Sequence, residues 1–155
     1  MISPRSFSFG GTAAIVTSMG IIIGLGTATA ATATIVSGLL VVALADNISD
    51  SLSIHMYQEA ESLAGRAAFR ATLANFVVRV VVVLTFVLIV LVFPHPYVEI
   101  LALAWGFLLL AGLSYTLARA RGVSPLPEVG KHLAVAVVVI AASRLIGSWI
   151  LHNVG

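Results

Sequence analysis

The sequence has no cysteine and few charged residues, and these two absences exclude several classes of protein. Without cysteine there can be no disulfide, no thiolate metal site and no cysteine nucleophile. Charged residues make up 9% of the 155 positions, whereas soluble domains average about a quarter. Hydrophobic residues make up 60%, so we expect an integral membrane protein that lies in a lipid bilayer and forms one domain over residues 1–155.

The sequence also lacks the motifs that support catalysis or nucleic-acid binding. It has no Gly-rich phosphate loop, no Gly-x-Ser-x-Gly and no His-Glu-x-x-His. Its eight Lys and Arg residues are scattered along the chain and do not form a basic face, so no nucleic-acid partner is expected. We therefore predict that the protein is not an enzyme and has no covalently bound cofactor.

Five segments are long and apolar enough to cross a bilayer, whose hydrocarbon core needs about 20 residues of helix. We predict them at residues 9–27, 32–62, 74–93, 97–118 and 131–151. Twenty unbroken apolar residues favour a membrane helix over a strand, even where valine is abundant. The fold class is therefore an all-α integral membrane protein with five transmembrane helices.

The positions of the basic residues predict the orientation of these helices. Six of the eight lie at one side of the predicted bundle, at Arg5, Arg66, Arg70, Arg119, Arg121 and Lys131. The two connections at the other side contain no Lys or Arg. Because cytoplasmic loops are enriched in Lys and Arg, we expect a cytoplasmic N-terminus and an outside C-terminus, in a prokaryotic cytoplasmic membrane.

The second predicted helix carries polar residues that do not suit a lipid-facing surface. Residues 43–61 read ALADNISDSLSIHMYQEAE, and no helix breaker occurs between Ile35 and Glu61. The helix is expected to be continuous, about 45 Å long, and to extend into the cytoplasm. On a helical wheel, one stripe about 80° wide contains Asp46, Asp50, Ser53, Tyr57 and Glu61.

The aspartates in this stripe need a partner. An Asp at mid-helix costs about 2.5–3.5 kcal/mol to insert, whereas each Leu, Ile or Val recovers only about 0.3–0.6 kcal/mol. The stripe is therefore expected to face protein, water or an ion. Carboxylate, amide and hydroxyl oxygens are hard ligands, and aspartates at positions i and i+4 can both reach one cation. The candidate metal ligands are Asp46, Asn47, Ser49, Asp50 and Glu61, with His55, Met56 and Glu59 as secondary candidates.

Other charges offer structural alternatives. Arg79 lies about 7 Å into the third helix, at nearly the depth of Asp46, and could neutralise one carboxylate. The second would still need a proton or a cation. Arg144 and Glu99 could also pair, or Arg144 could extend to the interface, and we assign both a structural role. His55 and Glu59 also fit a solvated i,i+4 pair.

Two segments carry a resemblance to a known family, FGGTAAIVTSMGIIIG at 9–24 and ALADNISD at 43–50. They resemble the vacuolar iron transporter family, with first-helix pattern F-G-x-x-D-G-(L/I)-x-(S/T)-(S/T)-x-x-x-x-x-G and second-helix pattern A-(D/E/G)-A-x-S-M. The matching residues are Phe9, Gly10, Ile15, Thr17, Ser18, Gly24, Ala45, Asp46 and Ser49. The resemblance implies five helices, an extended second helix, metal transport, and a dimer with its pathway near the two-fold axis.

The sequence departs from the family pattern in both helices and in the connection between them. Ala13 stands where the family has an acidic residue, Ala14 where it has glycine, and Asp50 where it has methionine. The family's long cytoplasmic insert is reduced here to YQEAESLAGRAAFRATL. A hard carboxylate in place of a soft thioether keeps a cation site and suits manganese, magnesium or calcium at least as well as iron.

The first predicted helix is rich in small residues. Gly20 and Gly24 form a Gly-x-x-x-Gly step, which lets helices approach closely. The step fits either a homodimer through this face or packing against helices of the same chain.

These observations lead to one functional prediction and one alternative. The prediction is a transporter that exports a divalent cation (iron, manganese, magnesium or calcium) as its substrate from the cytoplasm, in exchange for protons. The alternative is a non-transporting membrane subunit or scaffold that keeps the family fold. Ala13 and the short insert fit the alternative, whereas Asp50 is a charge that a purely structural helix does not need.

Overall fold

The computed structural model describes residues 5–29, 31–60 and 65–154 of the chain. Within these ranges the regular structure consists of five α-helices, α1 (Arg5–Thr29), α2 (Thr32–Ala60), α3 (Gly65–Val92), α4 (Tyr97–Ala120) and α5 (Pro125–Asn153). Each is long and apolar enough to span a membrane. The prediction of an all-α fold with five helices long and apolar enough to span a membrane is therefore confirmed.

Three helices begin earlier than predicted, and the difference is smallest in α1, which begins at Arg5 where we predicted residue 9. α3 begins at Gly65 where we predicted residue 74, and α5 begins at Pro125 where we predicted residue 131. Apolar runs mark where a helix is in lipid, but the helical hydrogen bonds continue beyond them. The residues before position 74 are mostly alanine, arginine and leucine, which are good helix formers, and proline is favoured at the first helical position.

The ends of the helices follow from local sequence. Pro94 and Pro96 separate α3 from α4, because proline has no N–H with which to continue a helix. α4 ends in a Schellman motif, in which Gly122 has a positive φ of 70°. In this motif the Gly122 N–H donates to the Arg119 carbonyl at 3.1 Å, and the Val123 N–H donates to the Ala118 carbonyl at 3.1 Å.

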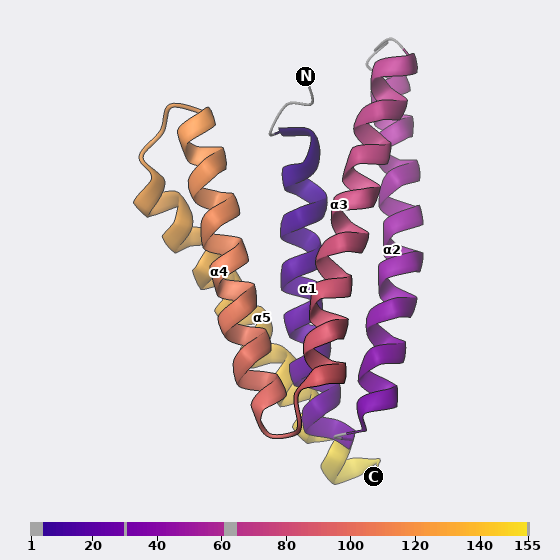
Figure 1. Ribbon diagram of the computed structural model, residues 1–155, viewed down its shortest axis with the longest axis vertical. Coiled ribbons are helices and arrows are strands. Elements are labelled where there is room, and N and C mark those ends of the chain that lie inside the picture. Colours follow the sequence, from indigo (N-terminus) through magenta and orange to yellow (C-terminus); the bar gives the residue numbers. More distant parts are fainter. Residues whose placement is uncertain (1–4, 30, 61–64, 155) are drawn as a thin grey trace.

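α1 lies in the middle of the bundle (Figure 1) and contacts each of the other four helices. In the described residues α2 contacts only α1 and α3, and α5 contacts only α1 and α4. The chain termini lie at opposite ends of the bundle, as an odd number of spans requires. Figure 1 also shows that α4 and α5 diverge from α2 and α3 toward the end where α1 begins. That end is the predicted cytoplasmic side.

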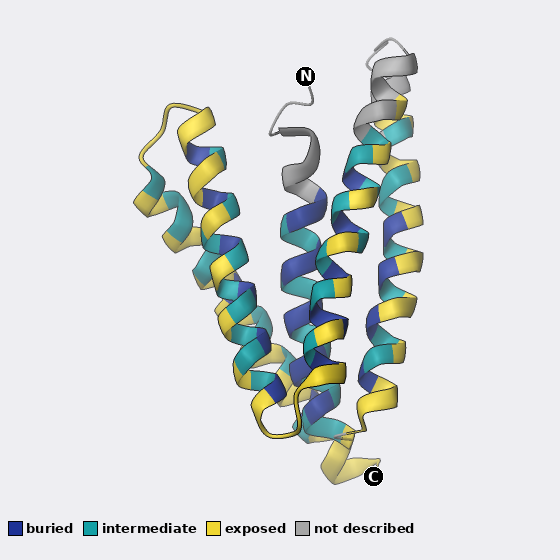
Figure 2. Ribbon diagram, in the orientation of Figure 1, coloured by how far each residue is buried: buried dark blue, intermediate teal, exposed yellow. Residues whose placement is uncertain are grey.

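The core follows α1, which Figure 2 shows as the most continuously buried helix. Its side chains Ile15, Met19 and Ile22 are buried, together with Phe86 of α3 and Leu110 of α4. By contrast, the outer faces of α2 and α5 expose large apolar side chains along most of their length. In a membrane protein such faces contact lipid, whose tails are as apolar as the side chains.

The Gly-x-x-x-Gly step of α1 packs against α5 of the same chain. A Cβ atom added at Gly20 would lie 3.0 Å from the Ser143 Oγ, and one added at Gly24 would lie 3.4 Å from the Ser143 carbonyl oxygen. On α5, a Cβ atom at Gly147 would overlap the carbonyl oxygen of Gly24. The structure therefore favours the intramolecular alternative for this step, and the homodimer stays a prediction.

Candidate ion triad between α2 and α3

Three charged side chains meet where α2 packs against α3. The Arg79 side chain is 3% exposed and contacts both aspartates of α2. Its Nη2 donates to Asp46 Oδ2 at 3.3 Å, and its Nη1 donates to Asp50 Oδ2. The side chains of Asp46 and Asp50 are 48% and 31% exposed. We call this group the ion triad.

The local fold brings these residues together in two ways. α2 is continuous through Asp46 and Asp50, so the two carboxylates lie one turn apart on the same side of the helix. The Asn47 Nδ2 donates to the Phe76 carbonyl oxygen at 3.0 Å and fixes the register of α2 against α3. In this register the long Arg79 side chain reaches both carboxylates.

The ion triad contains two carboxylates and one guanidinium, so it carries one excess negative charge when all three groups are ionised. Each carboxylate contacts Arg79 through Oδ2, and neither Oδ1 has a hydrogen bond to any residue that the structure describes. These two Oδ1 atoms are the oxygens through which a further cation could bind. Sequence reasoning paired Arg79 with one aspartate, whereas in the structure it bridges both.

The predicted polar stripe of α2 divides into two parts. Asp46 and Asp50 turn toward α3, but Ser53 and Tyr57 are exposed. The most buried residues of α2 are four apart, at Ile35, Leu39, Ala43 and Asn47. Four residues make slightly more than one turn of a helix, so residues spaced by four move gradually around it. The face that contacts α3 therefore moves away from the stripe. The stripe therefore leaves the α2–α3 contact beyond Asp50, and the expectation that it faces protein, water or an ion stays a prediction there.

The remaining predicted ligands lie apart from the ion triad or outside the described residues. Asn47 is fully buried beside the triad. Ser49 is exposed, and its carbonyl oxygen accepts a hydrogen bond from Ser53 at 3.0 Å. Met56 is exposed, and His55 is half-buried one turn beyond Ser51. Glu61 lies outside the described residues, as does the side chain of Glu59.

Arg144 and Glu99 are not part of the ion triad. Arg144 is exposed on α5, and Glu99 is half-buried on α4, with its Oε1 close to Gly26 of α1. Residues 5–29, 31–60 and 65–154 contain no ion pair between these two side chains. Of the two predicted alternatives, the structure favours an Arg144 that extends outward.

Asn75 is a polar residue of this region that sequence reasoning missed. It is 1% exposed, and its Oδ1 accepts a hydrogen bond from the Gly10 N–H at 2.7 Å. A Cβ atom at Gly10 would overlap the Asn75 side chain, so glycine is required there. The sequence feature that could have identified Asn75 is its spacing from Arg79, because residues four apart lie on one face of a helix.

Two further observations bear on what the site could bind. Within the described ranges no three His, Asp or Glu side chains are grouped so that they could hold a metal ion. Comparison with known proteins gives no match to a family model, a curated protein or a solved structure. The ion triad and the sequence motifs are therefore the features that bear on function.

Proposed function

We propose that the protein carries a divalent metal cation across the membrane and that Asp46 and Asp50 bind this cation. The observation that carries the proposal is the composition of the ion triad, in which two carboxylates share one guanidinium within the apolar spans of α2 and α3. One negative charge is left over. In a low-dielectric environment that charge needs a cation or a proton as its partner.

The carboxylate oxygens that Arg79 does not contact support a cation site. Both Oδ1 atoms belong to side chains that are partly exposed on α2, so neither side chain is enclosed in the buried core. Aspartates one turn apart can both reach one ion, and carboxylate oxygens suit manganese, magnesium and calcium. Iron is the ion that the family resemblance implies.

Arg79 acts in this proposal as the resident counter-charge. It holds both carboxylates when no metal is bound, and a divalent cation competes with it for them. A proton on one carboxylate brings the net charge of the ion triad to zero, so a proton can be exchanged for the metal. In the predicted orientation this exchange exports the metal from the cytoplasm.

Metal flux into proteoliposomes tests the proposal. Manganese entry is followed by quenching of an internal fluorescent chelator, with a proton gradient imposed across the membrane. Asp46→Asn keeps the shape of the side chain and removes its charge, so we expect at least about a tenfold loss of flux, the effect of about 1.4 kcal/mol. Glu99→Gln is the matched control, because it removes another carboxylate from a membrane span away from the ion triad. Equal flux in wild type and in the Asp46→Asn, Asp50→Asn double variant would contradict the proposal.

A second function, a non-transporting membrane subunit, is favoured by one specific observation. Arg79 already contacts both carboxylates, and no third acidic or histidine side chain joins them in the part of the chain that the structure describes. In this case the ion triad only joins α2 to α3. Wild-type protein would then give the flux of protein-free liposomes, and Asp46→Asn would lower thermal stability alone.

A further inference from the structure

Four buried polar atoms lie on α2 and α3 without a hydrogen-bond partner among the described residues. They are Asn47 Oδ1, Ser51 Oγ, Thr72 Oγ1 and Asn75 Nδ2. Asn47 and Asn75 are among the most completely buried side chains of the protein. An unpaired buried polar group costs about 1–3 kcal/mol, and the bilayer core supplies no water to relieve it. Four such groups in one region therefore need an explanation.

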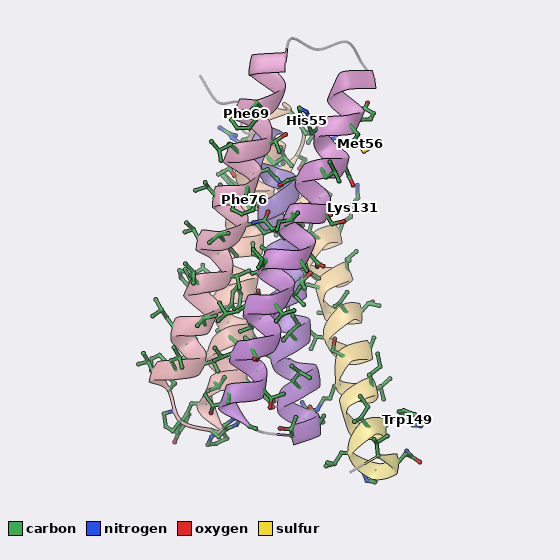
Figure 3. All side chains as sticks on the ribbon, turned by 90° about the vertical axis from the view of Figure 1, so that its right-hand side faces the viewer. His55, Met56, Phe69, Phe76, Lys131 and Trp149 are labelled. Carbon is green, nitrogen blue, oxygen red and sulfur yellow. The ribbon has the colours of Figure 1, made fainter. Side chains whose placement is uncertain are left out.

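The register of the two helices brings these atoms to one part of the bundle. The hydrogen bond from Asn47 to the Phe76 carbonyl places these two residues at the same level. α2 and α3 run antiparallel and side by side, as Figure 3 shows with Phe76 labelled. One turn toward the α2–α3 connection, about 5.4 Å, Ser51 of α2 comes level with Thr72 of α3. We call the stretch of α2 and α3 that carries these four residues the polar seam.

The hydroxyl groups of the polar seam differ from several others in this protein. Thr27, Thr85 and Thr116 donate to carbonyl oxygens of their own helices, at 2.7, 2.6 and 2.9 Å. Such a bond is the usual way in which a hydroxyl is satisfied inside a helix. Ser51 and Thr72 make no such bond in the described structure. Their hydroxyls therefore need a partner outside their own helices.

Water fits this set of atoms better than a metal ion does. The polar seam contains an amide oxygen that accepts, an amide nitrogen that donates, and two hydroxyls that can do both. A water molecule donates and accepts, and buried waters typically make about three hydrogen bonds to such groups. A cation would be repelled by the Asn75 amide N–H groups, and none of the four atoms belongs to a negatively charged group.

We propose that the polar seam holds ordered water and that this water connects the ion triad to the aqueous phase beyond the α2–α3 connection. Asn75 of the polar seam lies one turn from Arg79 on the same face of α3, so the water lies beside the triad. The apolar span of α2 ends at Tyr57, about 9 Å along the helix from Ser51. About three waters at hydrogen-bond spacing cover this distance. The inference holds whether the triad transports metal or only joins the helices.

Cysteine accessibility tests this inference without any measurement of metal. The chain has no cysteine, so Ser51→Cys introduces a single thiol of nearly the same shape. The reagent is 2-aminoethyl methanethiosulfonate, applied to protein in liposomes of neutral lipid. Only a thiolate reacts, and a thiolate forms where water reaches it. Ser18→Cys is the matched buried control on α1, and Ser53→Cys is the exposed control on α2.

We expect Ser51→Cys to react at least about tenfold faster than Ser18→Cys, because a dry site disfavours the thiolate by more than about one pKa unit. Equal slow rates at positions 51 and 18, with fast reaction at position 53, would overturn the proposal.

A second measurement covers the case in which Ser51→Cys fails to fold. Thr72→Val removes the hydroxyl from the polar seam and keeps the shape of the side chain. If water satisfies that hydroxyl, the thermal midpoint of the variant stays at or below that of wild type. If the seam is dry, the variant loses an unpaired polar group and its midpoint rises, which would overturn the proposal.

Discussion

On one side of α1, α2 and α3 are joined by an ion triad and buried amides, whereas on the other side α5 meets α1 through glycine and serine. The second kind of contact is sufficient to pack helices in a membrane, where close approach of small residues supplies the van der Waals energy. The contact of α5 with α1 therefore needs no charged group. The proposed function assigns the charged groups between α2 and α3 a role in binding the cation.

The largest loss of stability is expected where α2 meets α3, from Arg79→Leu. This change leaves Asp46 and Asp50 without their common partner. Removal of one member of a buried ion pair costs about 3–5 kcal/mol, and we expect the lower end because both carboxylates are partly exposed. Reversible unfolding in mixed micelles measures the loss. Arg144→Leu on the exposed face of α5 is the matched control and should change stability little. Equal losses of stability in the two variants would contradict the claim that the ion triad joins α2 to α3.

A smaller loss of stability is expected where α5 meets α1, from Gly147→Ala. The added methyl group would overlap the carbonyl oxygen of Gly24, which is backbone and cannot turn away. Overpacking of this kind typically costs about 1–3 kcal/mol. At Gly112 of α4 nothing lies within 4 Å of an added Cβ atom, so Gly112→Ala should instead gain about 0.5–1 kcal/mol from helix propensity. The same unfolding assay compares the two variants, and a loss at Gly112 as large as that at Gly147 would count against close helix packing.

The smallest loss of stability is expected where α3 meets α4. Trp105 Nε1 donates to Thr85 Oγ1 at 2.9 Å, a single neutral hydrogen bond. Trp105→Phe should therefore cost about 0.5–1.5 kcal/mol from the lost bond. In Thr85→Val the partner is already absent, so the two changes together should cost less than the sum of their separate effects. Additive losses in this double-mutant cycle would show that the bond contributes nothing.

Hydropathy predicted the fold because each membrane span must satisfy its own backbone hydrogen bonds and is therefore a helix. The continuity of α2 through Asp46 and Asp50 followed from the lack of a helix breaker. The starts of α3 and α5 could not be predicted, since helices continue beyond the apolar run. Depth along the helices brought Arg79 near Asp46, but contact with Asp50 as well depends on how α3 is rotated against α2. The polar seam was missed because Ser51, Thr72 and Asn75 become neighbours only once the register is known.

Anomalous diffraction from manganese-soaked crystals determines whether Asp46 and Asp50 together bind a metal cation. Manganese scatters anomalously, so its position is found independently of the protein model. We expect a peak within about 2.0–2.6 Å of Asp46 Oδ1 and Asp50 Oδ1, with Arg79 displaced from at least one carboxylate. The peak should be absent in crystals of Asp46→Asn and present in crystals of Glu99→Gln. A wild-type crystal in which Arg79 contacts both carboxylates and no anomalous peak lies beside them would contradict metal binding by Asp46 and Asp50.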